Sequence, residues 1–224
     1  MKQALKKIFY GYDIEQFLLP LGLWGLFLLI GILFFEGELA VDRSVAFLGY
    51  VMPLLSGVLA ANALLNDTAL ELRFSTAQSA WRMLAERILL LFGFLALLAI
   101  SFQVILAFAG VDYAKFGGML QRQLVWAVPC LMMLTLGSLG SFLARNAIAG
   151  AGIVSGLWIL QVVMRIWFAQ EPVMQYIFLF QGMMRVHLPG SAGLIRNQIS
   201  LTILSILFFI ASGLLLMRQE RYLK

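Results

Sequence analysis

Six apolar runs, each close to 20 residues long, constrain this chain more than any other feature of its sequence. A helix needs about 20 apolar residues to cross the hydrocarbon core of a bilayer. Lipid cannot satisfy an open backbone, so each run is predicted to be a helix. One charged residue, Arg165, lies within a run, near its end. The predicted spans are 17–35, 44–65, 88–110, 123–143, 147–168 and 199–217.

The composition excludes a soluble enzyme, because 62% of the residues are hydrophobic and only 12% are charged. Soluble domains are about 45–50% apolar and about 25% charged. We therefore predict an all-α membrane protein in which residues 1–224 form a single transmembrane domain. The net charge of +5 comes from basic residues that flank the apolar runs, so the expected surroundings are membrane lipid and not nucleic acid.

The distribution of basic residues predicts the orientation of the six spans. An even number of spans puts both termini on one side of the membrane. Ten Lys and Arg residues lie on the side of the termini and five on the opposite side. Because cytoplasmic loops carry the excess of Lys and Arg, both termini are predicted to be cytoplasmic. The predicted location is the cell membrane, inner or plasma, with multiple crossings.

Two segments outside the spans have an amphipathic pattern. Residues 1–16 place Leu5, Ile8 and Phe9 at helical spacing among lysines, which predicts a helix in the membrane interface or, alternatively, a frayed terminus. Residues 172–188 contain an apolar stretch of about 12 residues, which is too short to cross and is predicted to be re-entrant or interfacial.

The loop of residues 66–87 is the only cytoplasmic loop of substance. Thr68 and Glu71 have the spacing of a helix capping box. Leu70, Phe74 and Ala77 then follow at i, i+4 and i+7, which gives a short helix an apolar face. This helix fits two roles equally well: contact with a cytoplasmic partner, or contact with the membrane surface alone.

The sequence offers no residues for enzymatic chemistry. It contains no G-x-x-x-x-G-K-[ST] motif, so ATP cannot bind through a P-loop. No predicted span carries a carboxylate or a histidine, which disfavours an intramembrane protease. The single Cys130 and the single His187 form no metal or redox motif. We expect no catalytic residue and no cofactor on this chain.

Polar and small residues within the spans have two interpretations. The polar ones are costly in lipid and are therefore candidates for lining a substrate path, although bonds between helices explain them equally well. The candidates for the path are Tyr50, Asn62, Gln103 and Gln161. Glycines from Gly137 to Gly156, including Gly152-x-x-x-Gly156, predict tight packing of the fourth and fifth spans.

The loop after the second span also carries a distinctive local pattern. It reads Asp67-Thr68-Ala69-Leu70-Glu71-Leu72, then Ser75-Thr76, and then Trp81-Arg82-Met83-Leu84-Ala85-Glu86-Arg87 at the entry to the third span. With six spans, an amphipathic N-terminal segment and an apolar insert before the last span, this pattern resembles the type-2 ABC transporter permeases. Ala69 and Ala77 stand where members of that family often have glycine and proline.

The resemblance implies a permease subunit of an ATP-driven exporter, which moves a hydrophobic or amphipathic substrate by alternating access. ATP and Mg²⁺ would bind to a separate ABC ATPase subunit. A second permease copy or paralogue would pair through the first and fifth spans, as a homo- or heterodimer. Residues 68–77 would form the coupling helix and residues 172–188 would cap the path outside. The implied coupling residues are Thr68, Leu70, Glu71, Arg73, Phe74 and Ala77.

Two other functions remain open at this point. A secondary transporter or channel would work without an ATPase, although such proteins usually show intramembrane charges or broken helices. A membrane assembly factor would use its apolar surface and its amphipathic loop to hold partner helices. The identity of a substrate does not follow from the sequence.

Overall fold

The computed structural model describes residues 15–33, 41, 44–63, 65, 79–113, 118–182 and 193–217. Over these ranges the chain forms helices and turns and no β-strand. The elements are α2 (Glu15–Leu33), η1 (Ala46–Val51), α4 (Met52–Ala63), α6 (Ala80–Phe108), α7 (Met119–Ala144), α8 (Ala147–Val163), α9 (Arg165–Gln170), η3 (Met174–Tyr176) and α11 (Gly193–Leu216).

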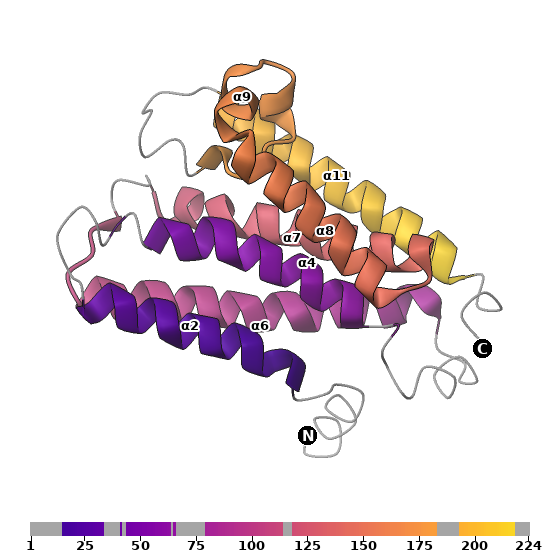
Figure 1. Cartoon of the computed structure of the whole chain (residues 1–224), viewed down its shortest axis with the longest axis horizontal. Coiled ribbons are helices and arrows are strands. Elements are labelled where there is room, and N and C mark those ends of the chain that lie inside the picture. The colour runs from indigo at the N-terminus through magenta and orange to yellow at the C-terminus, as the bar shows by residue number, and fades with distance from the viewer. Residues whose placement is uncertain are drawn as a thin grey trace.

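Five of the described helices are long and apolar enough to cross a membrane, which confirms an all-helical membrane protein. They are α2, the continuous helix formed by η1 and α4, α6, α7 and α11. The apolar helix α8 is shorter, at 17 residues. Successive helices run in opposite directions through the bundle (Figure 1). We name the end where α6 starts the Trp81 end, and the opposite end, where α8 stops, the Phe180 end.

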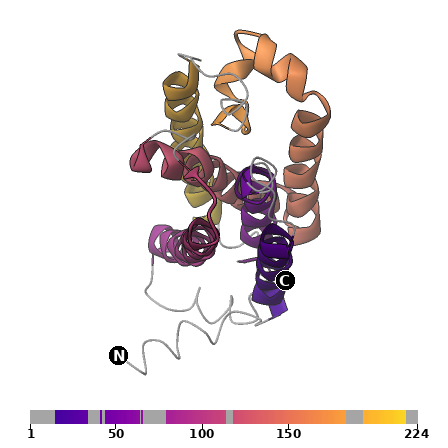
Figure 2. The ribbon, with the colours of Figure 1, turned by 90° about the vertical axis from the view of Figure 1, so that its left-hand side faces the viewer.

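Helix α7 lies at the centre of the bundle and packs against α4, α8 and α11 (Figure 2). Two-thirds of its most apolar window is buried, as is that of η1–α4. Helix α2 packs on α6 at the periphery, and only 11% of its window is buried. The surface of α2 therefore remains available to lipid or to another protein.

Small residues set the distances between α7 and its neighbours. A Cβ added to Gly137 of α7 would lie 2.1 Å from the carbonyl oxygen of Gly57 in α4. A Cβ added to Gly150 of α8 would lie 2.6 Å from the backbone nitrogen of Ser141. The predicted tight packing of the fourth and fifth spans is thus confirmed. The Gly152-x-x-x-Gly156 motif does not make it, because an added Cβ at either position meets no described atom within 4 Å.

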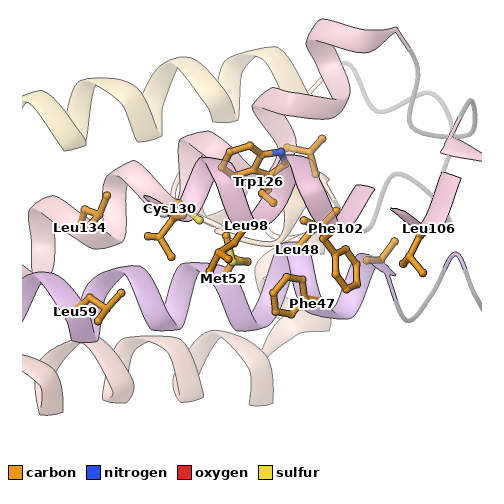
Figure 3. Close-up of a cluster of buried hydrophobic side chains, with 14 of the residues drawn as sticks. Phe47, Leu48, Met52, Leu59, Leu98, Phe102, Leu106, Trp126, Cys130 and Leu134 are labelled. Carbon is orange, nitrogen blue, oxygen red and sulfur yellow. The ribbon is translucent and has the colours of Figure 1, made fainter. Parts of the chain in front are cut away.

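The largest buried cluster fills the space between η1–α4, α6 and α7. Phe47 and Phe102 lie at its centre, with ring centroids 4.4 Å apart (Figure 3). Met52 and Cys130 extend the cluster along the bundle. A second cluster gathers around α7, α8 and residues 178–180, and a third lies at the Trp81 end around Phe142 and Leu216.

The described helices differ most from the predicted spans at three places. Helix α11 starts at Gly193, six residues before the predicted span 199–217. Helix α6 starts eight residues before the predicted span, because Ser79 caps it by accepting a bond from the Arg82 N–H. Its first turns carry an ion pair between Arg82 and Glu86, with Nε and Oε1 2.9 Å apart. The predicted span 147–168 is interrupted at Met164, so α8 rises roughly 26 Å, short of the ~30 Å hydrocarbon core.

Several predicted features lie outside the described residues. They are the amphipathic segment up to residue 14, the proposed coupling helix over residues 68–77, and residues 183–188 of the predicted re-entrant segment. The placement of both termini relative to a membrane likewise stays a prediction.

Candidate functional site

The four candidate path residues are not gathered at one place. Tyr50 and Gln161 both contact the segment of residues 177–180 at the Phe180 end. Gln103 lies between α6 and α7, and Asn62 lies at the opposite end of α4. The structure therefore points to one candidate site, which we call the junction. It consists of Tyr50, Trp158, Gln161, Phe178, Phe180 and Asn197.

Tyr50 reaches the junction on a stretch of π-helix, η1. Pro53 follows closely and has no N–H, so it cannot donate to the carbonyl four residues before it. The backbone here forms bonds of wider spacing, such as that from the Met52 N–H to the Phe47 carbonyl. The carbonyl of Tyr50 accepts a bond of 2.8 Å from Trp158 Nε1 in α8. Short π-helical stretches occur frequently at functional sites.

Residues 171–182, which follow α9, turn back into the bundle without forming a long helix. After Glu171, a single 3₁₀ turn is followed by irregular backbone, yet Phe178, Leu179 and Phe180 are fully buried. Non-helical backbone at such depth is tolerated only where protein groups satisfy its hydrogen bonds. We call residues 171–182 the inserted segment.

Two side-chain amides satisfy the inserted segment from opposite sides. Gln161 of α8 donates to the Ile177 carbonyl at 3.2 Å and accepts from the Leu179 N–H at 2.9 Å. Asn197 of α11 donates to the carbonyls of Gln175 and Phe178, at 2.6 and 2.9 Å. Both amides are buried. They replace the main-chain partners that a regular helix would have provided.

Aromatic rings fill the space around these amides. The rings of Tyr50 and Phe180 lie 4.5 Å apart, and Phe178 meets Phe180 edge-on at 5.5 Å. Trp158 also meets Phe180 edge-on, at 6.4 Å. The junction therefore offers hydrogen bonds and apolar surface, and none of its six residues is a carboxylate, histidine or cysteine.

Gln103 belongs to a separate polar contact. It exchanges two hydrogen bonds with Gln123 of α7, at 3.2 and 3.1 Å, and also donates to the Ala99 carbonyl. Gln123 accepts a further bond from Trp126 Nε1 at 2.8 Å. These bonds join α6 to α7, which matches the packing interpretation of Gln103. Asn62 donates within its own helix, to the Val58 carbonyl.

A polar group lies beyond the end of α6. The hydroxyls of Ser44 and Tyr113 share a hydrogen bond of 2.6 Å, and the Arg122 guanidinium lies 5.5 Å from the Tyr113 ring centroid. Burial raises the pKa of Tyr113 above its ordinary value, against the opposing effects of the Ser44 bond and the Arg122 charge. This group joins the chain before η1 to the loop after α6.

Sequence reasoning missed four members of the junction: Trp158, Phe178, Phe180 and Asn197. Asn197 was assigned to a loop, although the apolar pattern of α11 already begins at Leu194 and leaves Asn197 as a polar residue within a helix. No signal marks Phe180 among its many apolar neighbours. The proposed coupling residues, from Thr68 to Ala77, lie outside the described residues.

Within the described residues, no group of three His, Cys, Asp or Glu side chains could hold a metal ion. Comparison of the whole chain with protein-family models, with curated proteins and with solved structures finds no match. Functional inference therefore depends on the chain's own residues.

Proposed function

We propose that this chain is the membrane-spanning permease subunit of an ATP-driven exporter of the type-2 ABC family. One observation carries the proposal. Residues 66–78, which contain the Thr68–Leu72 pattern, join the end of α4 to the start of α6. The end of α4 and the start of α6 both lie at the Trp81 end, where the described chain also begins and finishes (Figure 1). In the proposal this end faces the cytoplasm and meets a separate ATPase subunit.

The proposal counts α8 together with α9 as the sixth crossing. Helix α8 is short, at 17 residues, and the chain turns at Met164 into the six-residue helix α9. The inserted segment would then be the first part of the predicted re-entrant cap. Its burial and its side-chain hydrogen bonds support that role, because irregular backbone needs a protein environment at membrane depth.

A second permease copy or paralogue would pair with this chain through α2 and α8. Support comes from the surfaces of these two helices. Only 11% of the α2 span is buried in the single chain, and a Cβ added to Gly152 or Gly156 of α8 would meet no described atom within 4 Å. A partner helix can approach closely at such glycines. ATP and Mg²⁺ would stay on the ATPase subunits.

Phe74 provides a sharp test of the ATPase contact. Removal of a buried aromatic anchor from an interface typically costs about 2 kcal/mol or more. We expect Phe74→Ala to weaken co-purification of the ATPase and to separate ATP hydrolysis from transport. Leu72 falls on the opposite side of the predicted helix, so Leu72→Ala is the matched control and should leave both unchanged.

The first measurement is mild-detergent purification of the tagged chain from its own host, followed by mass spectrometry. A stoichiometric P-loop ATPase in the eluate is expected. A chain that elutes alone, under conditions that keep ABC complexes intact, would end the proposal. Normal transport and normal co-purification in Phe74→Ala would remove the assigned coupling role.

A secondary transporter is the second candidate, and the junction is the observation that favours it. Transporters of that class build their substrate sites from interrupted helices. Here a π-helical stretch and the broken α8 both meet the inserted segment, at Tyr50 and Gln161. Uptake into vesicles that contain this chain alone, with an ion gradient and no ATP, distinguishes a secondary transporter from an ABC permease subunit. Gradient-driven uptake would favour the second candidate.

A further inference from the structure

A cavity of about 150 Å³ lies between α6, α7 and α11, away from the junction. It is near the Trp81 end, because the Phe209 ring in its wall lies 5.8 Å from the Trp81 ring. No step of the proposed function uses it. The residues that line it are Ile88, Leu131, Thr135, Ser205, Ile206 and Phe209.

The cavity has a buried floor and an open rim. Ile88, Thr135 and Ser205 are buried and form the floor. At the rim, 53% of Ile206 is exposed. Its neighbours on α11, Ile203 and Leu207, are equally exposed and apolar. The rim therefore belongs to a surface that faces lipid when α11 spans a membrane.

Both hydroxyls in the wall are already engaged as donors. Ser205 donates to the Leu201 carbonyl at 2.8 Å. Thr135 donates to the carbonyls of Leu131 and Met132, at 3.1 and 2.9 Å. No hydroxyl hydrogen is left for a guest, and the other lining side chains are hydrocarbon. A bound water needs two to four polar partners, so water is a poor occupant.

We propose that this cavity binds one hydrocarbon chain, namely an acyl chain of a membrane phospholipid that enters past Ile206. The open side of the cavity faces hydrocarbon when α11 spans a membrane, so the occupant that its lining favours is an apolar chain. An acyl chain restores the dispersion contacts that the floor lacks when the cavity is empty. The proposal requires only that the helices span a membrane, and so does not depend on an ATPase partner.

The test uses the full chain in phosphatidylcholine vesicles whose lipid carries a photoreactive diazirine midway along one acyl chain. After irradiation, the labelled residues are located by peptide mass spectrometry. Ser205→Leu fills the floor, whereas Ser205→Ala leaves it open and is the matched control. Thr135→Leu fills the cavity from the facing helix and serves as the second variant if Ser205→Leu does not fold.

We expect label on Leu131 and Phe209 in the unaltered chain and in Ser205→Ala, and loss of that label in the filled variants. Label on the exposed Ile203 should stay unchanged in all of them, because it reports ordinary lipid contact. Unchanged labelling of Leu131 and Phe209 in both filled variants would overturn the site. A parallel experiment uses a free fatty acid that carries the same diazirine, to distinguish a phospholipid from a free fatty acid as the source of the bound chain. If the fatty acid labels the cavity residues and the phospholipid does not, the phospholipid is not the occupant.

Discussion

Replacement of Gln161 by leucine tests whether side-chain amides hold the inserted segment in place. Leucine has a side chain of similar size but cannot form the hydrogen bonds to the Ile177 carbonyl and the Leu179 N–H. Side-chain hydrogen bonds in membrane proteins average about 0.6 kcal/mol. A buried group left unpaired costs about 1–3 kcal/mol. Two bonds are lost and two buried backbone groups remain, so the expected loss of unfolding free energy lies between about 1 kcal/mol, for two bonds at that average, and about 6 kcal/mol, for two groups left unpaired.

The assay is equilibrium unfolding in mixed detergent micelles, followed by circular dichroism, with hydrogen exchange measured on residues 171–182. We expect faster exchange at Leu179 in Gln161→Leu, because its N–H loses its acceptor. Gln198→Leu is the control, since Gln198 Nε2 is buried without a partner in the part of the chain that the structure describes. Replacement there should cost little stability.

Asn197→Leu extends the same test from the other side of the inserted segment. It frees the carbonyls of Gln175 and Phe178 and should destabilise by a similar amount. The two amides hold one short segment, so the double variant should lose less than the two single losses combined. Full stability and unchanged exchange in Gln161→Leu, or an equal loss in Gln198→Leu, would refute the reasoning.

Two further predictions concern packing and pH. Gly137→Ala places a methyl group 2.1 Å from the Gly57 carbonyl oxygen, so we expect a loss of about 2 kcal/mol or more in the same unfolding assay. In the single chain, an alanine at position 152 would meet no described atom, so Gly152→Ala should be neutral or slightly stabilising. Because its pKa is raised, the Tyr113 hydroxyl holds its proton more tightly in the folded chain than in the unfolded chain. The contribution of Tyr113 to folding stability is therefore fully present below about pH 10 and is lost as the pH rises further. Tyr113→Phe should reduce that alkaline loss and cost about 1 kcal/mol at neutral pH through the lost Ser44 bond; an unchanged alkaline profile would contradict the assignment.

The helical class and the approximate positions of the apolar helices follow from the length of each run, because lipid accepts little else than a helix. The predicted number of six spans is not confirmed, since five of the described helices are long enough to cross a membrane. Errors arose at the ends of helices, which hydropathy does not mark. Ser79 starts α6 well before its apolar run, and the chain breaks at Met164 inside a run that is continuous by hydropathy alone. Neither the cap nor the break changes the apolar character of the segment, so hydropathy does not report them.

The polar residues within the spans were likewise predicted only in part from the sequence. A glutamine within an apolar run is recognisable as costly, and Gln103 and Gln161 were both singled out for that reason. Their partners are not recognisable in that way. Gln103 bonds to another glutamine 20 residues along the chain, whereas Gln161 bonds to backbone atoms of residues 177 and 179. One amide therefore joins two helices and the other holds a segment that is not helical.

Hydrophobic runs and their flanking charges were sufficient to assign this chain to the membrane and to predict its helical class, because both depend on local transfer free energies. The junction and the lipid-facing cavity depend instead on which helices surround α7 and how closely they approach. Gly57, Gly137 and Gly150 set those distances, and the folding back of residues 171–182 brings Phe180 against Tyr50. Such contacts join residues far apart in the chain, and their energies exist only once the bundle is assembled.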